Sequence, residues 1–270
     1  NMVIARKREN SGAFPFPQEQ TLMVRRPVTR ALRRIWFAQL KRQAIPLSAR
    51  EVGEILDAVK QHKTDILHVY FGSVAAQLLP VLRKVSCPVI VSFHGADAGV
   101  DTQNKSYREA LREIFRLADL VLGRSDSLLK RLQELGCETA KLRINPTGIP
   151  MEAFSFQQRC VPPGDGSWNF LQVCRLVEKK GLPTALRAFA EVCRVHSSAQ
   201  FHIAGDGPMR LELETLAGEL GILESVQFHG FINQEQLTQL AGESHIFFHP
   251  SQMGADGNRE GIPNAMLEAM

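Results

Sequence analysis

The stretch DILHVYFGSVAAQLLPVLRKVSCPVIVSF, residues 65–93, contains the pattern that decides the fold. It opens with a short apolar run, passes through Gly72 into a segment of helical character, and closes with a second apolar run. Short apolar runs joined by a helix are typical of neighbouring strands in a parallel sheet that is covered on both faces. The stretch therefore predicts one β-α-β unit of an α/β protein.

The alternation continues on the C-terminal side of this unit. Further strands are expected at Asp119–Arg124 and Lys141–Asn145. Between them, Ser125 is a suitable N-cap for a helix that Gly136 would close. These elements predict an N-terminal Rossmann-like domain over residues 1–156.

A proline- and glycine-rich segment at residues 157–168 interrupts the pattern, which then resumes over residues 169–270. There we expect strands at residues 169–176, 199–205, 225–231 and 245–251, and helices at residues 182–195, 208–220, 234–243 and from Pro263 onward. The fold class is therefore α/β, with two tandem Rossmann-like parallel-sheet domains joined by a linker at 157–168. Such pairs of domains commonly bind a ligand between the carboxyl ends of their strands.

Composition excludes a membrane-spanning chain. Of the 270 residues, 44% are apolar and 22% are charged, which is typical of a globular protein, and no apolar run reaches the length of about 18 residues that spans a bilayer. The five cysteines include no C-x-x-C pair, so we expect reduced thiols in a cytoplasmic protein and no zinc site. The segment before Pro27 shows no signal-peptide pattern, and no clean strand is expected there.

The charge is distributed unevenly. Residues 1–50 carry eleven Lys or Arg and two acids, a net +9, so the rest of the chain sums to −5. Within this basic part, residues 28–44 have helical spacing, with an apolar face and basic side chains that lie largely off it. Two interpretations stay open: a helix that lies on an anionic membrane surface, and a surface helix docked on its own domain.

The C-terminal stretch EGIPNAMLEAM, residues 260–270, places two carboxylates on either side of a turn. Pro263 suits the first position of a helix, whose unpaired amides would attract an anion. Glu260 precedes this helix and Glu268 lies within it. Because one carboxylate can accept two hydroxyl hydrogen bonds, the arrangement favours a nucleotide-sugar, with a phosphate at the helix start and a diol at each carboxylate.

This stretch resembles the E-x7-E signature of retaining glycosyltransferases of the GT-B fold, family 4 type. Four further motifs agree with that family in the same order: FHGAD (93–97), RLVEKKG (175–181), GDGP (205–208) and FHGF (228–231). The resemblance runs from about Asp65 to the end of the chain. Relative to the family we expect truncation at both ends, with the first strand and its glycine-rich loop missing and the second domain incomplete at its C-terminal end.

The resemblance also implies roles for the matching residues. His94 would face the sugar of the donor, Arg175 and Lys180 would neutralise its diphosphate, Glu260 would hold the transferred sugar, and Glu268 would hold the ribose. The other donor-binding residues that the resemblance implies are Gly205, which allows close backbone approach, Gly230 and Phe231, which would border the nucleobase, and Gly261, Ile262, Pro263 and Asn264, which would bind phosphate.

Structural roles are the alternatives for several of these residues. Arg175 and Lys180 could be ordinary solvated charges, and His94 could make a structural hydrogen bond. Phe231 could pack in the core. For Asp97, holding the histidine loop and binding the acceptor are equally open.

The implied reaction moves a sugar from a nucleotide-sugar, most simply a UDP- or GDP-sugar, to a saccharide or glycolipid acceptor with retention of anomeric configuration. The implied setting is cell-surface polysaccharide biosynthesis in the cytoplasm, with residues 28–44 as a peripheral contact to the inner face of the membrane. No D-x-D triad occurs in the sequence, so a metal is not expected to bridge the diphosphate, and the resemblance implies no further cofactor and no nucleic-acid partner.

Other functions stay open at this point. The chain could be a fragment that binds a nucleotide-sugar without turnover, or a glycosyl phosphorylase of the same fold. A dehydrogenase is disfavoured because Arg210 stands where the G-x-G-x-x-G pattern requires its third glycine. A solute-binding protein is disfavoured by the absence of a signal-peptide pattern.

Overall fold

The computed structural model describes residues 2–5, 17–24, 47–146, 148, 167–254 and 263–270. The chain divides into two compact units, Asn1–Pro146 and Thr147–Met270. Two α/β units are what the sequence predicts. The predicted limits of the linker, at residues 157–168, stay a prediction, because most of that segment lies outside the described residues.

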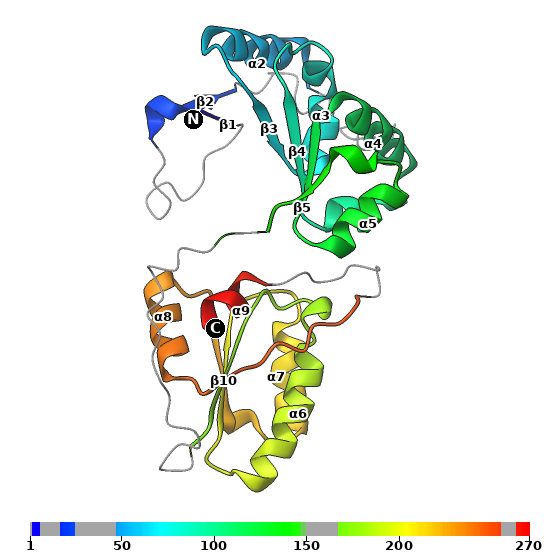
Figure 1. The fold of residues 1–270 in the computed structure, drawn as a ribbon. Helices are drawn as coiled ribbons and strands as arrows, with labels where there is room; N and C mark the ends of the chain where they lie inside the picture. Colours follow the sequence, from blue (N-terminus) through cyan, green and yellow to red (C-terminus); the bar gives the residue numbers. More distant parts are fainter. Residues whose placement is uncertain (1, 6–16, 25–46, 147, 149–166, 255–262) are drawn as a thin grey trace. The chain divides into compact units, whose positions relative to one another are not determined.

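Unit 1 is built on a four-stranded sheet with the order β3-β4-β5-β6 (Figure 1). Its strands are Leu67–Tyr70 (β3), Val89–Phe93 (β4), Leu120–Gly123 (β5) and Leu142–Ile144 (β6). Each strand is parallel to its neighbour, as predicted, so all four carboxyl ends lie at one edge of the sheet.

Three helices accompany this sheet, namely α3 (Gly72–Leu82), α4 (Lys105–Leu117) and α5 (Asp126–Glu134). The predicted N-cap of α5 is confirmed, because the Ser125 hydroxyl accepts a hydrogen bond from the backbone of Leu128. Apolar side chains of strands and helices together form the core of the unit: Val91, Phe93, Val121, Leu79, Ile114 and Leu132.

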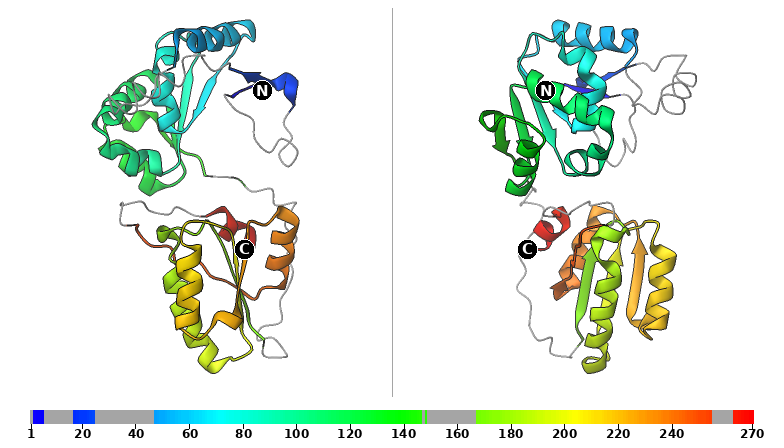
Figure 2. Two further views of the ribbon diagram at one scale, coloured as in Figure 1. Left: turned by 180° about the vertical axis from the view of Figure 1, so that it is seen from behind. Right: turned by 90° about the vertical axis from the view of Figure 1, so that its right-hand side faces the viewer.

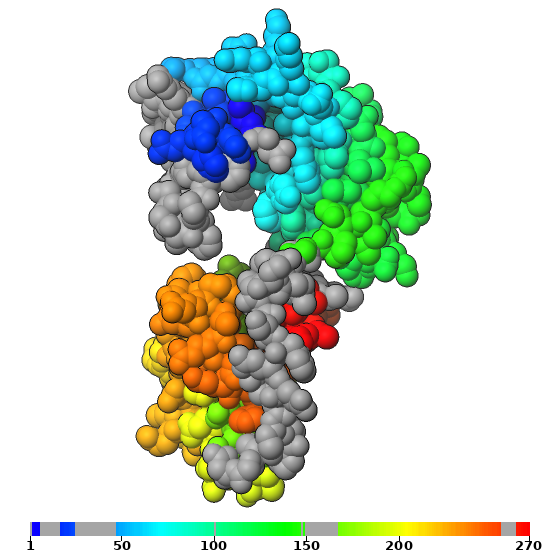
Figure 3. Space-filling model, turned by 60° about the vertical axis from the view of Figure 1, so that its left-hand side comes forward, coloured from blue at the N-terminus to red at the C-terminus, as the bar shows by residue number. Residues whose placement is uncertain are grey.

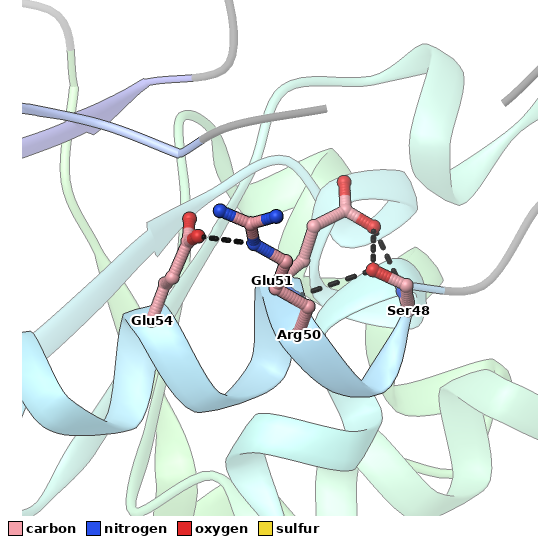
Figure 4. A network of polar contacts seen from close by, with 4 residues as sticks. All are labelled: Ser48, Arg50, Glu51 and Glu54. Atoms are coloured by element: carbon pink, nitrogen blue, oxygen red, sulfur yellow. Dashed lines mark hydrogen bonds and ion pairs between the residues drawn. The ribbon is translucent and has the colours of Figure 1, made fainter. Parts of the chain in front are cut away.

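A further helix of unit 1, α2 (Ala49–Gln61), was not expected from the apolar pattern. Ser48 and Glu51 form a reciprocal capping box at its start (Figure 4): the Ser48 hydroxyl accepts the Glu51 amide at 3.2 Å, and the Glu51 carboxylate accepts the Ser48 amide at 2.8 Å. The same view shows the exposed ion pair of Arg50 and Glu54, 3.0 Å long, which adds only a few tenths of a kcal/mol. The spacing S-x-x-E is the sequence signal that predicts this helix start.

Two short strands correct the expectation that no strand precedes Pro27. Val3–Ala5 (β1) and Thr21–Met23 (β2) pair with each other in parallel. Ile4 and Leu22 pack against the apolar cluster beneath α2. Strands of three residues are too short to give an alternating pattern that stands out in the sequence.

Unit 2 contains a second four-stranded parallel sheet, with the order β10-β7-β8-β9. Its strands are Asn169–Val173 (β7), Gln200–Ala204 (β8), Val226–Gly230 (β9) and Ile246–Phe247 (β10), the last much shorter than predicted. The chain adds β8 and β9 on one side of β7 and then returns to its other side with β10. The direction therefore reverses between β7 and β10, which makes this the topological switch point of the sheet.

The helices of unit 2 cover both faces of its sheet. Leu182–Val195 (α6) and Arg210–Glu219 (α7) lie on one face, and Gln234–Glu243 (α8) lies on the other (Figures 1 and 2). The outer side chains of α8 form part of the molecular surface (orange in Figure 3). The last helix, Asn264–Ala269 (α9), has Pro263 as its N-cap, so it begins one position after the start that the sequence predicted. None of the helices that the structure describes has both the length and the apolar character needed to cross a bilayer.

Candidate functional site

The first candidate site, in unit 1, is the loop that follows β4 and carries His94. Asp97 is only 2% exposed, and its carboxylate accepts hydrogen bonds from three backbone amides, those of His94 at 3.0 Å, Gly95 at 2.9 Å and Gly72 at 2.9 Å. The Tyr107 hydroxyl donates to the carbonyl of Asp97 at 2.7 Å. This geometry supports the loop-holding role of Asp97, and it joins the histidine loop to the first turn of α3.

The His94 ring lies among aromatic side chains. Its centroid is 4.4 Å from that of Phe71 and 5.7 Å from that of Tyr70, with the Tyr70 and His94 rings stacked at an interplanar angle of 21°. Within the described residues, the buried Nε2 atom of His94 has no hydrogen-bond partner. A buried polar atom of this kind is rare in folded proteins and calls for an explanation.

Electrostatics keep this imidazole neutral. Burial lowers the pKa of His94 below its ordinary value; the negative charge of Asp97 opposes the shift, and the positive charges of Arg124 and His68 add to it. A histidine with a lowered pKa is uncharged at pH 7. It can therefore donate or accept a hydrogen bond with a sugar hydroxyl without adding a positive charge to the site.

Phe71 has a strained backbone, with φ 74° and ψ 129°. A bulky residue in this region costs about 1–3 kcal/mol, so neighbouring interactions must hold it. Its amide donates to the carbonyl of Ser92 at 2.9 Å, and the next amide, that of Gly72, donates to Asp97. A Cβ at Gly72 would lie 2.2 Å from the ring of Phe93, so only glycine fits beside Phe71.

A second candidate site lies in unit 2, where the loops after β7 and β10 flank the switch point. These loops touch: the amide of Gln252 donates to the carbonyl of Lys179 at 3.0 Å. Gly181 has φ 66°, and a Cβ there would lie 1.7 Å from the carbonyl oxygen of Pro250. Ligands of open α/β sheets bind outside the carboxyl ends of the strands at such a switch point.

The β7 loop carries both cations that were predicted to bind a diphosphate. Arg175 is exposed and Lys180 is half-buried. The fully buried Gln172 donates its side-chain amide to the carbonyl of Lys180 at 3.0 Å, which fixes the backbone of that residue from inside the unit. The structure therefore brings Arg175 and Lys180 to one loop at the carboxyl edge of the sheet.

The glycine-rich loop after β8 packs directly on this β7 loop. Gly205 has φ 135°, and a Cβ there would lie 1.9 Å from the carbonyl oxygen of Cys174. The amide of Leu176 donates to the carbonyl of Asp206 at 3.0 Å, and the amide of Gly205 donates to that of Gly230 at 2.7 Å. The close approach predicted for Gly205 is thus made by the backbone of the protein itself, and it braces the loop that carries the cations.

Phe231 follows Gly230 at the end of β9 and is 87% exposed. Core packing, the structural alternative for this side chain, is therefore wrong. Gly230 has φ 68°, a conformation that favours glycine. Their contact with a nucleobase stays a prediction.

Part of the predicted site lies outside the described residues, namely Glu260, Gly261 and Ile262, together with the basic segment 28–44. The described part includes Pro263, half-buried, and Asn264, exposed. Glu268 is half-buried within α9. The donor-binding roles of all these residues stay predictions.

Sequence reasoning missed Gln172 and the aromatic pair of Tyr70 and Phe71. A signal for Gln172 exists, since a polar residue inside the apolar run NFLQV must find a buried partner. The sequence contains no comparable signal for Phe71, because a positive φ is expected at glycine and rarely at an aromatic residue.

Comparisons with known proteins identify the family of the chain. A model of glycosyltransferase family 4 matches residues 9–153, more than half of the chain. A model of glycosyl transferases group 1 matches residues 156–270. The two matches follow each other along the chain without overlap.

Curated relatives carry related names. The chain is 31% identical over 210 residues to a protein named as a colanic acid biosynthesis glycosyltransferase, WcaL, of Escherichia coli strain K12, covering 77% of this chain and 51% of that protein. It is 30% identical over 213 residues to the amylovoran biosynthesis glycosyltransferase AmsK of Erwinia amylovora, covering 78% of this chain and 52% of that protein. The chain thus spans about half the length of these relatives.

Solved structures share the fold at low sequence identity. The HepE protein of Anabaena in complex with UDP superposes with a TM-score of 0.67 at 17% identity, over 99% of this chain and 78% of that one. The lipopolysaccharide outer core galactosyltransferase WaaB superposes with a TM-score of 0.62 at 20% identity, over 93% of this chain and 63% of that one. These likenesses confirm the fold class, two Rossmann-like parallel-sheet domains of the GT-B type.

Proposed function

Because the chain belongs to glycosyltransferase family 4, we propose that it transfers a glycosyl unit from a nucleotide-sugar donor to a saccharide or glycolipid acceptor. The observation that supports this most strongly is the place of the β7 loop in unit 2. Arg175 and Lys180 lie at the carboxyl edge of the sheet, beside the switch point, where α/β domains bind nucleotides.

In this proposal the two cations bind the diphosphate of the donor. Departure of the nucleoside diphosphate leaves negative charge on phosphate oxygens, and charge-assisted hydrogen bonds from Arg175 and Lys180 stabilise that charge in the transition state. Three contacts brace the β7 loop, made by Gly205, by Gln172 and by the β10 loop. They hold the cations in place before the donor binds. Such preorganisation is what makes electrostatic stabilisation effective.

The stereochemical course in this proposal is retention at the anomeric carbon. The transition state is oxocarbenium-like, the departing phosphate helps to remove the proton of the acceptor hydroxyl, and no dedicated protein nucleophile is needed. The neutral imidazole of His94 would hydrogen-bond the transferred sugar near the reacting carbon. A metal bridging the diphosphate is not part of this scheme.

The two carboxylates of the C-terminal motif have different roles in the proposal. Glu260 holds the transferred sugar, and Glu268 holds the ribose diol of the nucleotide. Backbone amides of Gly261 to Asn264 add hydrogen bonds to the phosphate. Gly230 and Phe231, after β9, border the nucleobase.

The names of two relatives support a saccharide acceptor, because they refer to the biosynthesis of colanic acid and of amylovoran. We therefore place the reaction in cell-surface polysaccharide biosynthesis, on the cytoplasmic side of the membrane. Residues 28–44 are a candidate contact to anionic lipid, which sedimentation with anionic vesicles at low and high salt would test.

Titration with nucleoside diphosphates tests the proposed function. A ligand present at about 100 times its dissociation constant stabilises the folded protein by about 2.7 kcal/mol, so UDP or GDP should raise the melting temperature of the chain. If no nucleoside diphosphate does so, the donor assignment is wrong. Incubation of a disaccharide with inorganic phosphate tests the glycosyl phosphorylase alternative, which the glycosyltransferase names of the relatives do not favour.

A further inference from the structure

An exposed aromatic surface lies beside His94 and has no part in the donor chemistry proposed above. It consists of the side chains of Tyr70, 57% exposed, and Phe71, 45% exposed. Tyr70 is the last residue of β3, which pairs with β4, the strand that leads to His94. The Tyr70–Phe71 surface thus lies at the carboxyl edge of the unit 1 sheet, where a ligand of an α/β domain is expected.

The strained backbone of Phe71 creates this surface. In a regular strand, successive side chains point to opposite faces of the sheet, so Tyr70 and Phe71 would face apart. The positive φ at Phe71 instead lets both rings contact the same imidazole, at 5.7 Å for Tyr70 and 4.4 Å for Phe71. Asp97 holds this turn through the Gly72 amide and holds the histidine loop through two further amides.

The chemistry of the surface suits a sugar ring. A pyranose has a face of C–H groups, which buries apolar area against an aromatic ring and places polarised hydrogens on its negative π face. Its hydroxyls project from the ring edge, so they stay in contact with solvent while the apolar face covers the exposed rings of Tyr70 and Phe71.

We propose that the Tyr70–Phe71 surface is the stacking site for one pyranose ring of the acceptor saccharide. The proposal rests on the glycosyl transfer proposed above. It adds the residues that select the acceptor: two aromatic side chains, fixed relative to His94 by Asp97. The acceptor is recognised here as a six-membered sugar ring with one apolar face.

Saturation-transfer NMR on the whole chain tests this site with methyl α-D-glucopyranoside, methyl α-D-galactopyranoside and methyl α-L-fucopyranoside as probes. Sorbitol, an open-chain polyol, and cyclohexanol, an apolar ring, serve as control ligands. We expect at least one glycoside to give a signal about fivefold or more above both controls, the size of one good aromatic contact. Signals no larger than those of the controls would overturn the proposal.

Variants then locate the binding. Phe71→Gly removes the ring while glycine accepts the positive φ, so the chain should still fold, and Tyr70→Ser removes the second ring. Each should lower the glycoside signal to that of sorbitol. Ile66→Ser, an exposed site just before the amino end of β3, should leave the signal unchanged. An unchanged signal in both aromatic variants would overturn the assignment.

Nucleotide binding distinguishes an acceptor-sugar site from a donor-sugar site. UDP and GDP binding should be the same in Phe71→Gly, Tyr70→Ser and the unsubstituted chain. If UDP-glucose or GDP-mannose displaced the glycoside, the surface would belong to the donor sugar and the acceptor assignment would be wrong. If no nucleotide bound to any of these proteins, the proposed function itself would fail, independently of the sugar result.

Discussion

The Asp97 carboxylate joins the histidine loop to Gly72, 25 residues before Asp97, through hydrogen bonds from the amides of Gly72, His94 and Gly95. Asp97→Asn replaces one acceptor oxygen with an NH2 group that faces a backbone donor. We expect the free energy of unfolding to fall by about 1–3 kcal/mol, the cost of leaving a buried donor unsatisfied. Denaturant titration of the variant measures this.

Asp101→Asn is the matched control, because Asp101 is an exposed acid in the same loop. Its stability should stay within about 0.5 kcal/mol of the unsubstituted chain. Equal losses in the two variants would show that Asp97 has no special part in holding the loop.

The two cations of the β7 loop, Arg175 and Lys180, can be tested one at a time. Arg175→Ala or Lys180→Ala should weaken UDP or GDP binding at least about tenfold, because each removes a charge-assisted hydrogen bond to the diphosphate. Isothermal titration measures the change, with Arg187→Ala on the exposed side of α6 as control. Affinities unchanged in both loop variants would remove these cations from the site.

At the scale of elements, the contact between the β7 and β10 loops depends on Gly181. A methyl group there meets the Pro250 carbonyl and a backbone with φ 66°, so Gly181→Ala should destabilise unit 2 by more than about 1 kcal/mol. Gly53→Ala is the opposite case: it lies inside α2 with nothing within 4 Å, and should stabilise by about 0.5–1 kcal/mol. Thermal unfolding of both variants distinguishes the effects, and a neutral Gly181→Ala would mean that the loops can separate freely.

Neighbouring strands β8 and β9 contain a histidine pair, with His202 Nδ1 and His229 Nε2 3.0 Å apart. Partial burial lowers the pKa of both, and the charge of His229 lowers the pKa of His202 further. A hydrogen bond of His202 to Gln227 and the charge of Glu243 oppose the shift of His202. The unfolded chain, with an ordinary pKa of about 6.5, then binds more protons than the folded one. The free energy of unfolding that depends on this pair is therefore fully present above about pH 6.5, and it decreases as the pH falls below that value.

Urea unfolding at about pH 7.5 and 5.5 measures this loss, since ordinary histidines titrate between these values. Between the higher and the lower pH, the free energy of unfolding should fall less for His229→Gln than for the unsubstituted chain. His68 and His94 also have a lowered pKa but are common to both proteins, so the difference isolates the pair. Equal losses in the two proteins would contradict the assignment.

Elements with local signals were predictable from the sequence. The helix limits of α6 and α8 match the prediction, because Gly181 and the capping residue Asn233 mark their starts. The pair β1 and β2 was not predictable, because three-residue strands depend on a partner far along the chain. The amides that Asp97 binds and the positive φ of Phe71 are likewise set by tertiary contacts.

At the scale of the whole molecule, the proposed function assigns different parts of the chemistry to the two Rossmann-like units. Unit 2 holds the cation-bearing β7 loop at its switch point, and unit 1 holds His94 with the Tyr70–Phe71 surface at the carboxyl edge of its own sheet. The motif order along the chain predicted this division. The bracing of each loop by buried groups such as Gln172 and Asp97 emerged only from the structure, because their partners lie in other segments or on the backbone.

The central claim, binding of a nucleotide-sugar by the C-terminal motif, is tested most directly by calorimetric titration of Glu260→Gln and Glu268→Gln with the bare nucleoside diphosphate and with the full nucleotide-sugar. Glutamine keeps the size of the side chain but removes its charge, so each affected contact should lose about 1–3 kcal/mol. Glu268→Gln should weaken both ligands alike, since both contain ribose, and Glu260→Gln should weaken only the nucleotide-sugar. If neither change altered the binding of either ligand, the motif would be structural and the account of this protein as a nucleotide-sugar-dependent transferase would be contradicted.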